Sequence, residues 1–153
     1  GAMLADTWYA LKSAPEAIQG DKDTVLACVQ KDWRAMQFAS EALRGDVDVA
    51  MIAVKQNWRA LKMACPPVFG DKDVVLTAAR RYKKALDFAS KELRADKDFV
   101  LEAVALDGRF IEKATQELRA DKQVVLKAVT ESGSALEFAS DELRSDSSVV
   151  MTA

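Results

Sequence analysis

Apolar residues fall along this chain in short runs, each of which begins three residues after an aspartate. Typical runs read TVLACV, VVLTAA and VVLKAV. Apolar positions spaced by one, three and four residues lie on one broad face of a helix. An aspartate before a helix accepts hydrogen bonds from the free amides of the first turn, and its charge suits the positive end of the helix dipole. Each run therefore predicts a capped amphipathic α-helix, whose buried side in the first run is Val25, Leu26, Cys28 and Val29.

The capping aspartates recur at a fixed step of 25 residues, without insertions. They are Asp21, Asp46, Asp71, Asp96, Asp121 and Asp146. A period of this size is typical of a stacked array in which each unit contacts mainly its neighbours. We therefore expect a single repeat array over residues 6–153, with residues 1–5 as a lead-in that begins with the scar of a cleaved tag.

A second helix and a short third turn complete each predicted unit. The second helix is expected to bury a large residue, with an alanine three positions on: Met36, Leu61, Leu86, Ile111 and Leu136. A residue with a hydroxyl or thiol then precedes a short turn of helix: Ser40, Cys65, Ser90, Thr115 and Ser140. In a unit of 25 residues each of the two main helices is only about 10 residues long. Helices this short are marginal alone, so stability must come from stacking.

The pattern thus predicts an all-α fold, an α-solenoid of 25-residue helix-turn-helix repeats with a short third helical turn per unit. Half of the residues are hydrophobic and 30% are charged, which suits a globular chain with a core. The handedness of the array stays open.

The repeated Asp-x-x-x-Val-Leu-x-Ala-Val, followed by Ala-Leu-x-Phe-Ala-Ser-x-Glu-Leu-Arg, resembles a family of domains of unknown function built from tandem short helical repeats. The family is described in double units of about fifty residues, and its members are found in protists, algae and intracellular bacteria. The resemblance covers residues 6–153 and implies the helical array, but no activity and no catalytic residue. The CPPVFG stretch departs from the pattern, which puts the short turn there in doubt.

The composition argues against an enzyme. The chain has no histidine, which removes the commonest general base and metal ligand. The repeated aspartates lack the glycine turn and closing acid of a calcium loop. We expect no catalytic residue, no metal and no cofactor. The two cysteines favour a reducing, intracellular and cytoplasmic setting, with a secreted effector as the open alternative. No apolar run is long enough to span a membrane.

Three tryptophans share one register position in successive units, and Lys83, Gly108 and Gly133 occupy it in the next three. Because that position accepts lysine and glycine, we expect it to lie outside the core, along one edge. Basic residues flank it. The candidate binding residues are Trp8, Trp33, Trp58, Arg34, Arg59, Arg80, Arg81, Lys83 and Lys84. A second series, Arg44, Arg94, Arg119 and Arg144, is expected to pair with neighbouring acids.

Charge is unevenly distributed. Residues 53–94 carry ten basic and four acidic side chains, a net charge of +6, between two acidic segments. Tryptophan and arginine are enriched at protein-binding hot spots, and they also serve nucleic-acid binding. The plain alternative is that these side chains cover helix ends and keep the stack soluble.

These observations favour a non-catalytic scaffold that binds a protein partner and forms part of a longer protein. One alternative is binding of nucleic acid or another polyanion through the basic, tryptophan-bearing units. Another is a structural accessory domain of a larger enzyme or effector. Self-association through exposed array ends is also expected.

Overall fold

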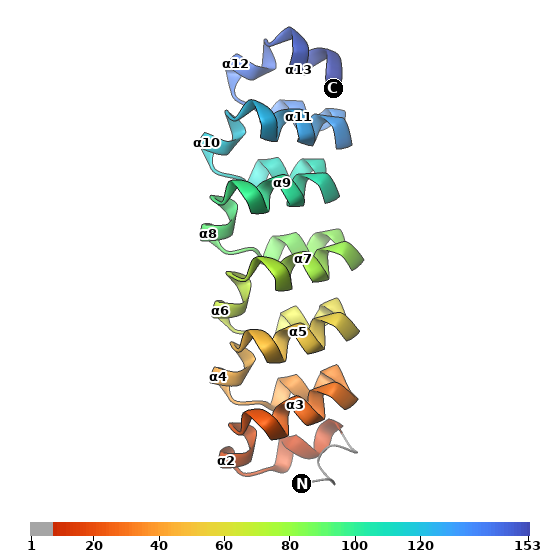
Figure 1. Cartoon of the computed structure of the whole chain (residues 1–153), viewed down its shortest axis with the longest axis vertical. Helices are drawn as coiled ribbons and strands as arrows, with labels where there is room; N and C mark the ends of the chain where they lie inside the picture. The colour runs from red at the N-terminus through yellow and green to blue at the C-terminus, as the bar shows by residue number, and fades with distance from the viewer. Residues whose placement is uncertain (1–7) are drawn as a thin grey trace. The chain divides into compact units, whose positions relative to one another are not determined.

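The computed structural model describes residues 8–153, without the side chain of Trp8, and every secondary-structure element in this part of the chain is a helix (Figure 1). The chain divides into two compact units, of which unit 1 ends at Phe88 and unit 2 runs from Ala89 to Ala153. The expected tag scar and lead-in, residues 1–5, lie outside the described residues. So does the candidate side chain of Trp8.

Six longer helices carry the predicted amphipathic runs. They are α3 (Lys22–Lys31), α5 (Val47–Gln56) and α7 (Lys72–Arg81) in unit 1, and α9 (Lys97–Leu106), α11 (Lys122–Glu131) and α13 (Ser147–Thr152) in unit 2. Each begins directly after a repeated aspartate whose carboxylate accepts from first-turn amides. The Asp71 carboxylate, for example, accepts the Val74 N–H at 3.0 Å. The predicted caps are confirmed.

The second helix of each repeat differs from the prediction in type and length. It is a 3₁₀ helix of six residues, not an α-helix of about ten: η1 (Trp8–Ser13), η2 (Trp33–Phe38), η3 (Trp58–Met63), η4 (Lys83–Phe88), η5 (Gly108–Lys113) and η6 (Gly133–Phe138). One extended residue, such as Asp32 with φ −155°, separates it from the longer helix. It ends early because Ala39 turns the chain out, so that the Ser40 N–H reaches the Gln19 carbonyl of the preceding repeat at 2.9 Å.

Short helices of four residues follow, as predicted. They are α2 (Glu16–Gln19), α4 (Glu41–Arg44) and α6 (Pro66–Phe69) in unit 1, and α8 (Lys91–Arg94), α10 (Gln116–Arg119) and α12 (Asp141–Arg144) in unit 2. The hydroxyls of Ser40, Ser90 and Ser140 accept the amide three residues on, at 3.3 to 3.4 Å. The CPPVFG stretch also forms its short helix, because both prolines lie in the first turn, where no intrahelical amide is needed. The doubt about this turn was unfounded.

A backbone hydrogen bond links successive short helices within each unit. The residue before one short helix donates its N–H to the last carbonyl of the previous short helix. The pairs are Ser40 to Gln19 at 2.9 Å and Cys65 to Arg44 at 3.0 Å in unit 1, and Thr115 to Arg94 at 3.3 Å and Ser140 to Arg119 at 3.0 Å in unit 2. These bonds repeat at the 25-residue step, so each fixes one repeat to the next in the same way.

The core lies between longer helices and 3₁₀ helices. In unit 1, α5 contacts α3 and α7 as well as η2 and η3; in unit 2, α11 contacts α9, α13, η5 and η6. The buried face of α5 is Val49, Ala50, Ala53 and Val54. In α3 the predicted Val25, Cys28 and Val29 are buried, whereas Leu26 is only half-buried. Met36, Leu61, Leu86 and Ile111 are buried as expected, whereas Leu136 is half-buried.

Candidate binding edge

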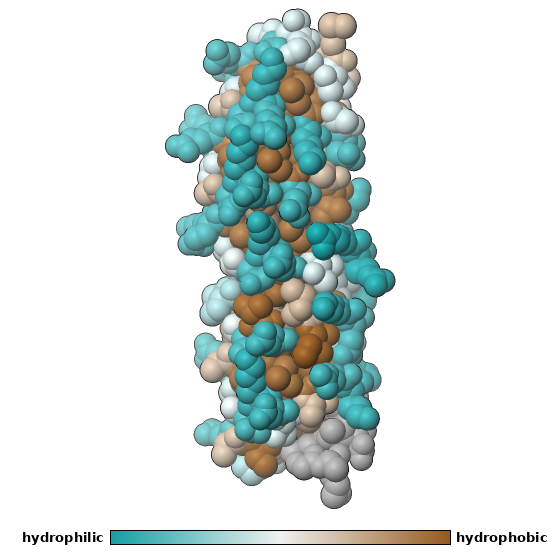
Figure 2. Space-filling view, viewed as in Figure 1, coloured by the Kyte–Doolittle hydropathy of each residue, from teal (hydrophilic) through white to brown (hydrophobic). Residues whose placement is uncertain are grey.

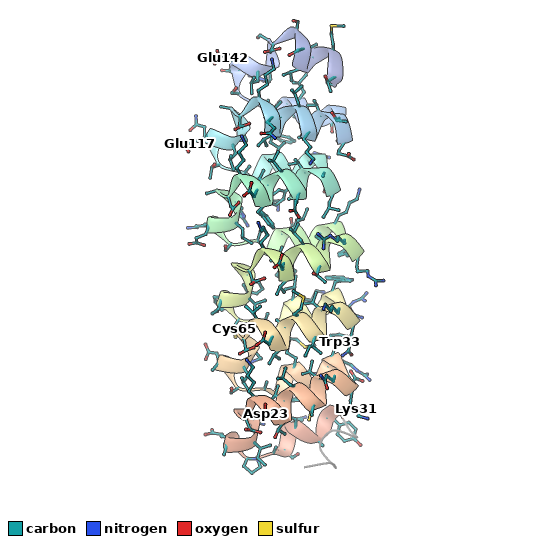
Figure 3. The ribbon with its side chains drawn as sticks, in the orientation of Figure 1. Asp23, Lys31, Trp33, Cys65, Glu117 and Glu142 are labelled. Carbon is teal, nitrogen blue, oxygen red and sulfur yellow. The ribbon has the colours of Figure 1, made fainter. Side chains whose placement is uncertain are left out.

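The predicted binding residues of unit 1 gather where the longer helices end and the 3₁₀ helices begin. Trp33 opens η2 and Trp58 opens η3, and both side chains are half-buried. Figure 3 places Lys31 and Trp33 together on this side of unit 1, apart from Cys65, which precedes the short helix α6. We call this surface the basic edge and define it as Trp33, Arg34, Trp58, Arg59, Lys62, Arg80, Arg81, Tyr82, Lys83 and Lys84.

Trp58 is the best-supported aromatic residue of the basic edge. Its ring stacks on Tyr82, with centroids 4.3 Å apart and an interplanar angle of 27°. The Arg59 guanidinium lies 5.1 Å and the Lys62 ammonium 5.4 Å from the Trp58 centroid. Both distances fall within the range of cation–π attraction. The tryptophan therefore orders two positive charges at the surface.

Tyr82 and Lys62 are members of this cluster that the sequence did not reveal. Tyr82 holds the extended position after α7, where other repeats have Asp32, Asn57 or Asp107. Those polar side chains accept the amide two residues on and cap the 3₁₀ helix, at 2.9 to 3.1 Å. The sequence did contain one indication of Tyr82: it is an aromatic residue at a position where other repeats have a polar residue that caps the 3₁₀ helix.

The environment of Trp33 is more polar. Its backbone N–H donates to the Oε1 of Gln56 at 2.9 Å. Next to it, the Arg34 guanidinium pairs with the Asp32 carboxylate at 2.6 Å. Hydrogen bonding from Arg34 lowers the pKa of Asp32, in spite of the opposing effect of partial burial. The Arg34 charge is thus partly neutralised by its neighbour.

Of the remaining cations, Arg59, Arg81, Lys83 and Lys84 are available to a partner. Arg59, Arg80, Arg81, Lys83 and Lys84 are all exposed. Among the described residues, no carboxylate pairs with Arg59, Arg81, Lys83 or Lys84. Arg59 and Arg81 line a pocket of about 190 Å³ together with Trp58. The structure therefore brings Trp58, Arg59 and Arg81 together, while Lys83 and Lys84 begin the adjacent η4.

The prediction that the register position of the tryptophans lies outside the core holds for Lys83 and Gly133, which are exposed, but not for Gly108. Gly108 occupies it in unit 2 and is buried. A Cβ atom there would lie 2.4 Å from the carbonyl oxygen of Ala128 and 3.0 Å from the backbone nitrogen of Ser132, at the end of α11. The position thus faces the end of the next longer helix. This explains why Trp33 and Trp58 are half-buried and not fully exposed.

The other arginine series behaves only in part as expected. Arg144 forms an ion pair with Asp141. In Arg44, Arg94 and Arg119, however, the Nε atom is buried without a hydrogen-bond partner in the part of the chain that the structure describes. In unit 2, Arg119 and Arg144 line a groove of about 430 Å³ that also holds Glu137 and Asp141. Its charges balance, so the groove has no preference for an anion.

Figure 2 shows hydrophobic surface between hydrophilic side chains on one face of unit 1, so this face is no continuous apolar patch. In unit 2, α13 exposes Met151, which is 86% accessible, and Val150. Self-association through such residues stays a prediction.

Over residues 8–153, no helix has the length and hydropathy required to cross a bilayer. Within the same residues, no three histidine, cysteine or acidic side chains are grouped so that they could bind a metal ion.

The model of one family, described as Domain of unknown function (DUF4116), matches the chain over residues 7–44, 21–67, 71–119 and 121–153. The chain belongs to the DUF4116 family. The resemblance inferred from the repeated motif is thereby confirmed. The DUF4116 match over residues 71–119 spans two 25-residue repeats, in keeping with a double unit. No curated protein and no solved structure matches the chain. The DUF4116 description assigns no activity, so function has to be argued from the side chains.

Proposed function

We propose that this chain is a non-catalytic α-solenoid scaffold that binds an acidic segment of a protein partner through the basic edge. The observation that carries the proposal is the cluster at Trp58, where Arg59 and Lys62 lie over a ring stacked on Tyr82. Arginine and tryptophan together are typical of binding hot spots. Exposed cations without a partner contribute little to folding, so their concentration in residues 53–94 supports a role in recognition.

The solenoid is supported by the strict step of the caps and by the hydrogen bonds between successive short helices within each unit. A stack of short repeats offers a long surface and few enclosed sites, which suits binding better than catalysis. The absence of histidine from the sequence points the same way. The thiols of Cys28 and Cys65 are in keeping with a reducing compartment.

Binding of nucleic acid is the second candidate, favoured by the net charge of +6 in residues 53–94. The Trp58 cluster favours protein. Base stacking requires an accessible aromatic face. Tyr82 already covers one face of Trp58, and two cations lie near the same ring. A base would have to displace these groups, whereas a carboxylate can bind the cations as they stand.

The test reverses the charge of exposed side chains, because substitutions at exposed positions leave the fold intact. A protein captured by the full chain is purified, and its dissociation constant is measured for Arg59→Glu, Lys83→Glu and the matched control Lys127→Glu, an exposed lysine of unit 2. We expect about tenfold weaker binding for either edge variant and less than about twofold for the control. Equal effects at all three positions would contradict the proposal.

A single-stranded oligonucleotide provides the second arm. Tight binding with a steep salt dependence, removed by the same edge variants, would favour the nucleic-acid alternative. We expect only weak binding at low salt.

A further inference from the structure

Gln56 joins two repeats of unit 1 by hydrogen bonds. The repeat that lacks these bonds indicates which chemical group the basic edge can bind. Its side-chain amide donates to the Val29 carbonyl at 2.6 Å, and its Oε1 accepts the Trp33 N–H at 2.9 Å. The carbonyl at the end of α3 thus receives a donor, and the N–H at the start of η2 an acceptor, from the next repeat. The amide at the start of η2 is thereby satisfied from within the chain.

The next repeat lacks this arrangement. Arg81 stands 25 residues after Gln56 and cannot accept a hydrogen bond. The backbone N–H of Trp58, which corresponds to that of Trp33, has no acceptor within residues 8–153. Trp58 and Arg81 both line the pocket of about 190 Å³ described above, with Val54, the counterpart of Val29. The pocket therefore lies where the Gln56 amide lies one repeat earlier.

The lining of this pocket selects for negative charge. Lys55, Arg59 and Arg81 contribute three cations, and none of the residues that line the pocket is acidic. A backbone N–H without an acceptor next to guanidinium groups suits an oxygen that carries charge. A carboxylate can accept the Trp58 N–H with one oxygen and an arginine with the other. A neutral amide offers only one oxygen and leaves the cations unpaired.

We propose that this pocket binds the side-chain carboxylate of a glutamate or aspartate in the partner, in the place that Gln56 Oε1 takes beside Trp33. The inference rests on the proposed function and specifies it, since it names the anchoring group of the acidic segment. Trp58, Arg59 and Arg81 are then the specificity-determining residues, while Lys83 and Lys84 attract the segment without fixing its register.

The experiment is a titration of the ¹⁵N-labelled full chain, followed by the backbone amide signals, with hexaglutamate peptide and with hexaglutamine peptide at constant ionic strength. We expect the Trp58 amide signal to move with hexaglutamate and to stay in place with hexaglutamine. Because a bound carboxylate replaces solvent at that N–H, the Trp58 shift should be among the largest in the spectrum. Equal responses to both peptides would overturn the assignment of a carboxylate.

Two matched variants separate a defined pocket from general attraction. Arg81→Gln and Lys84→Gln remove the same charge, but only the first introduces an amide that can fill the pocket from within, as Gln56 does in the preceding repeat. We expect Arg81→Gln to weaken hexaglutamate binding about tenfold, and Lys84→Gln by less than about threefold. We also expect Arg81→Gln to raise the melting temperature, because the Trp58 N–H then gains an acceptor.

The outcomes distinguish this inference from the broader proposal. If the signals of Arg59, Lys83 and Lys84 move while the Trp58 amide stays, or if both variants weaken binding equally, the pocket is not the anchoring site but the basic edge still binds acid. If none of these signals moves with hexaglutamate, both proposals fail. If inorganic phosphate shifts the Trp58 amide at the concentrations that suffice for hexaglutamate, the pocket binds small anions and the peptide assignment is wrong.

Discussion

Gly108→Ala is the substitution whose effect follows most directly from the geometry. Gly108 opens η5, and an added Cβ would lie 2.4 Å from the Ala128 carbonyl oxygen and 3.0 Å from the Cβ and the backbone nitrogen of Ser132. Two of these atoms belong to the backbone at the end of α11, so the clash cannot be relieved by rotation of a side chain. The end of α11 has to move away from η5.

Overpacking of this kind costs about 1–3 kcal/mol, and the loss of chain entropy in the unfolded state offsets about 0.4–1 kcal/mol of it. We therefore expect a net loss of about 1–2 kcal/mol. In a chain of this size such a loss lowers the melting temperature by roughly 2–8 °C. Circular dichroism at increasing temperature measures the change.

Gly133→Ala is the matched control, because Gly133 holds the same position in the next repeat. Its added Cβ would meet Ala153, at 3.2 Å from the carbonyl carbon and 3.9 Å from the Cα, with no contact as short as the 2.4 Å at Gly108. We expect Gly133→Ala to be neutral or more stable by up to about 1 kcal/mol. If Gly108→Ala melts at the same temperature as this control, the close approach between η5 and α11 is refuted.

Three further predictions concern caps and contacts between repeats. Gln56→Ala removes two hydrogen bonds to the preceding repeat and should lower the free energy of unfolding by about 1–2 kcal/mol in urea denaturation; no loss would contradict this contact. Cys65→Ser supplies a hydroxyl before α6, where the thiol makes no capping bond, and should stabilise the fold by up to about 1 kcal/mol; a lower urea midpoint would refute that reasoning. Hydrogen bonds from Ser148 and Lys122 lower the pKa of Asp146 from 3.8 to about 2, so its stabilising effect is complete above about pH 4 and is lost as the pH falls through about 2. A carboxyl titration by NMR with a midpoint near 4 would contradict this shift.

The parts of the fold that depend on local chemistry were predictable from the sequence. An aspartate before an apolar run has all it needs to cap a helix, and every repeated aspartate from Asp21 to Asp146 does so. The length of the second helix was not predictable, because η2 ends where the Ser40 N–H reaches a carbonyl of the preceding repeat. Nearly all residue types have the same backbone groups, so a hydrogen bond between backbone atoms cannot be inferred from the residue types.

The cations of the candidate site were predictable from the sequence, but the contacts between its side chains were not. The shared register of Trp33 and Trp58 predicted a common edge for both residues, yet the ring that stacks on Trp58 is Tyr82, 24 residues away, which only the packing of repeats brings near. Gly108 misled the sequence interpretation for a related reason. A position that accepts glycine can be open, or it can be too crowded for any side chain, and only the neighbouring helix end distinguishes the two.

Amide hydrogen exchange of the full chain, with and without a captured protein partner, tests most directly where the partner binds. Binding through the basic edge predicts added protection at the end of α5, the end of α7 and the first turns of η3 and η4, which together contain Trp58, Arg59, Arg81 and Lys83. Protection confined to the short helices α2, α4 and α6, with unchanged exchange at the Trp58 amide, would contradict the account.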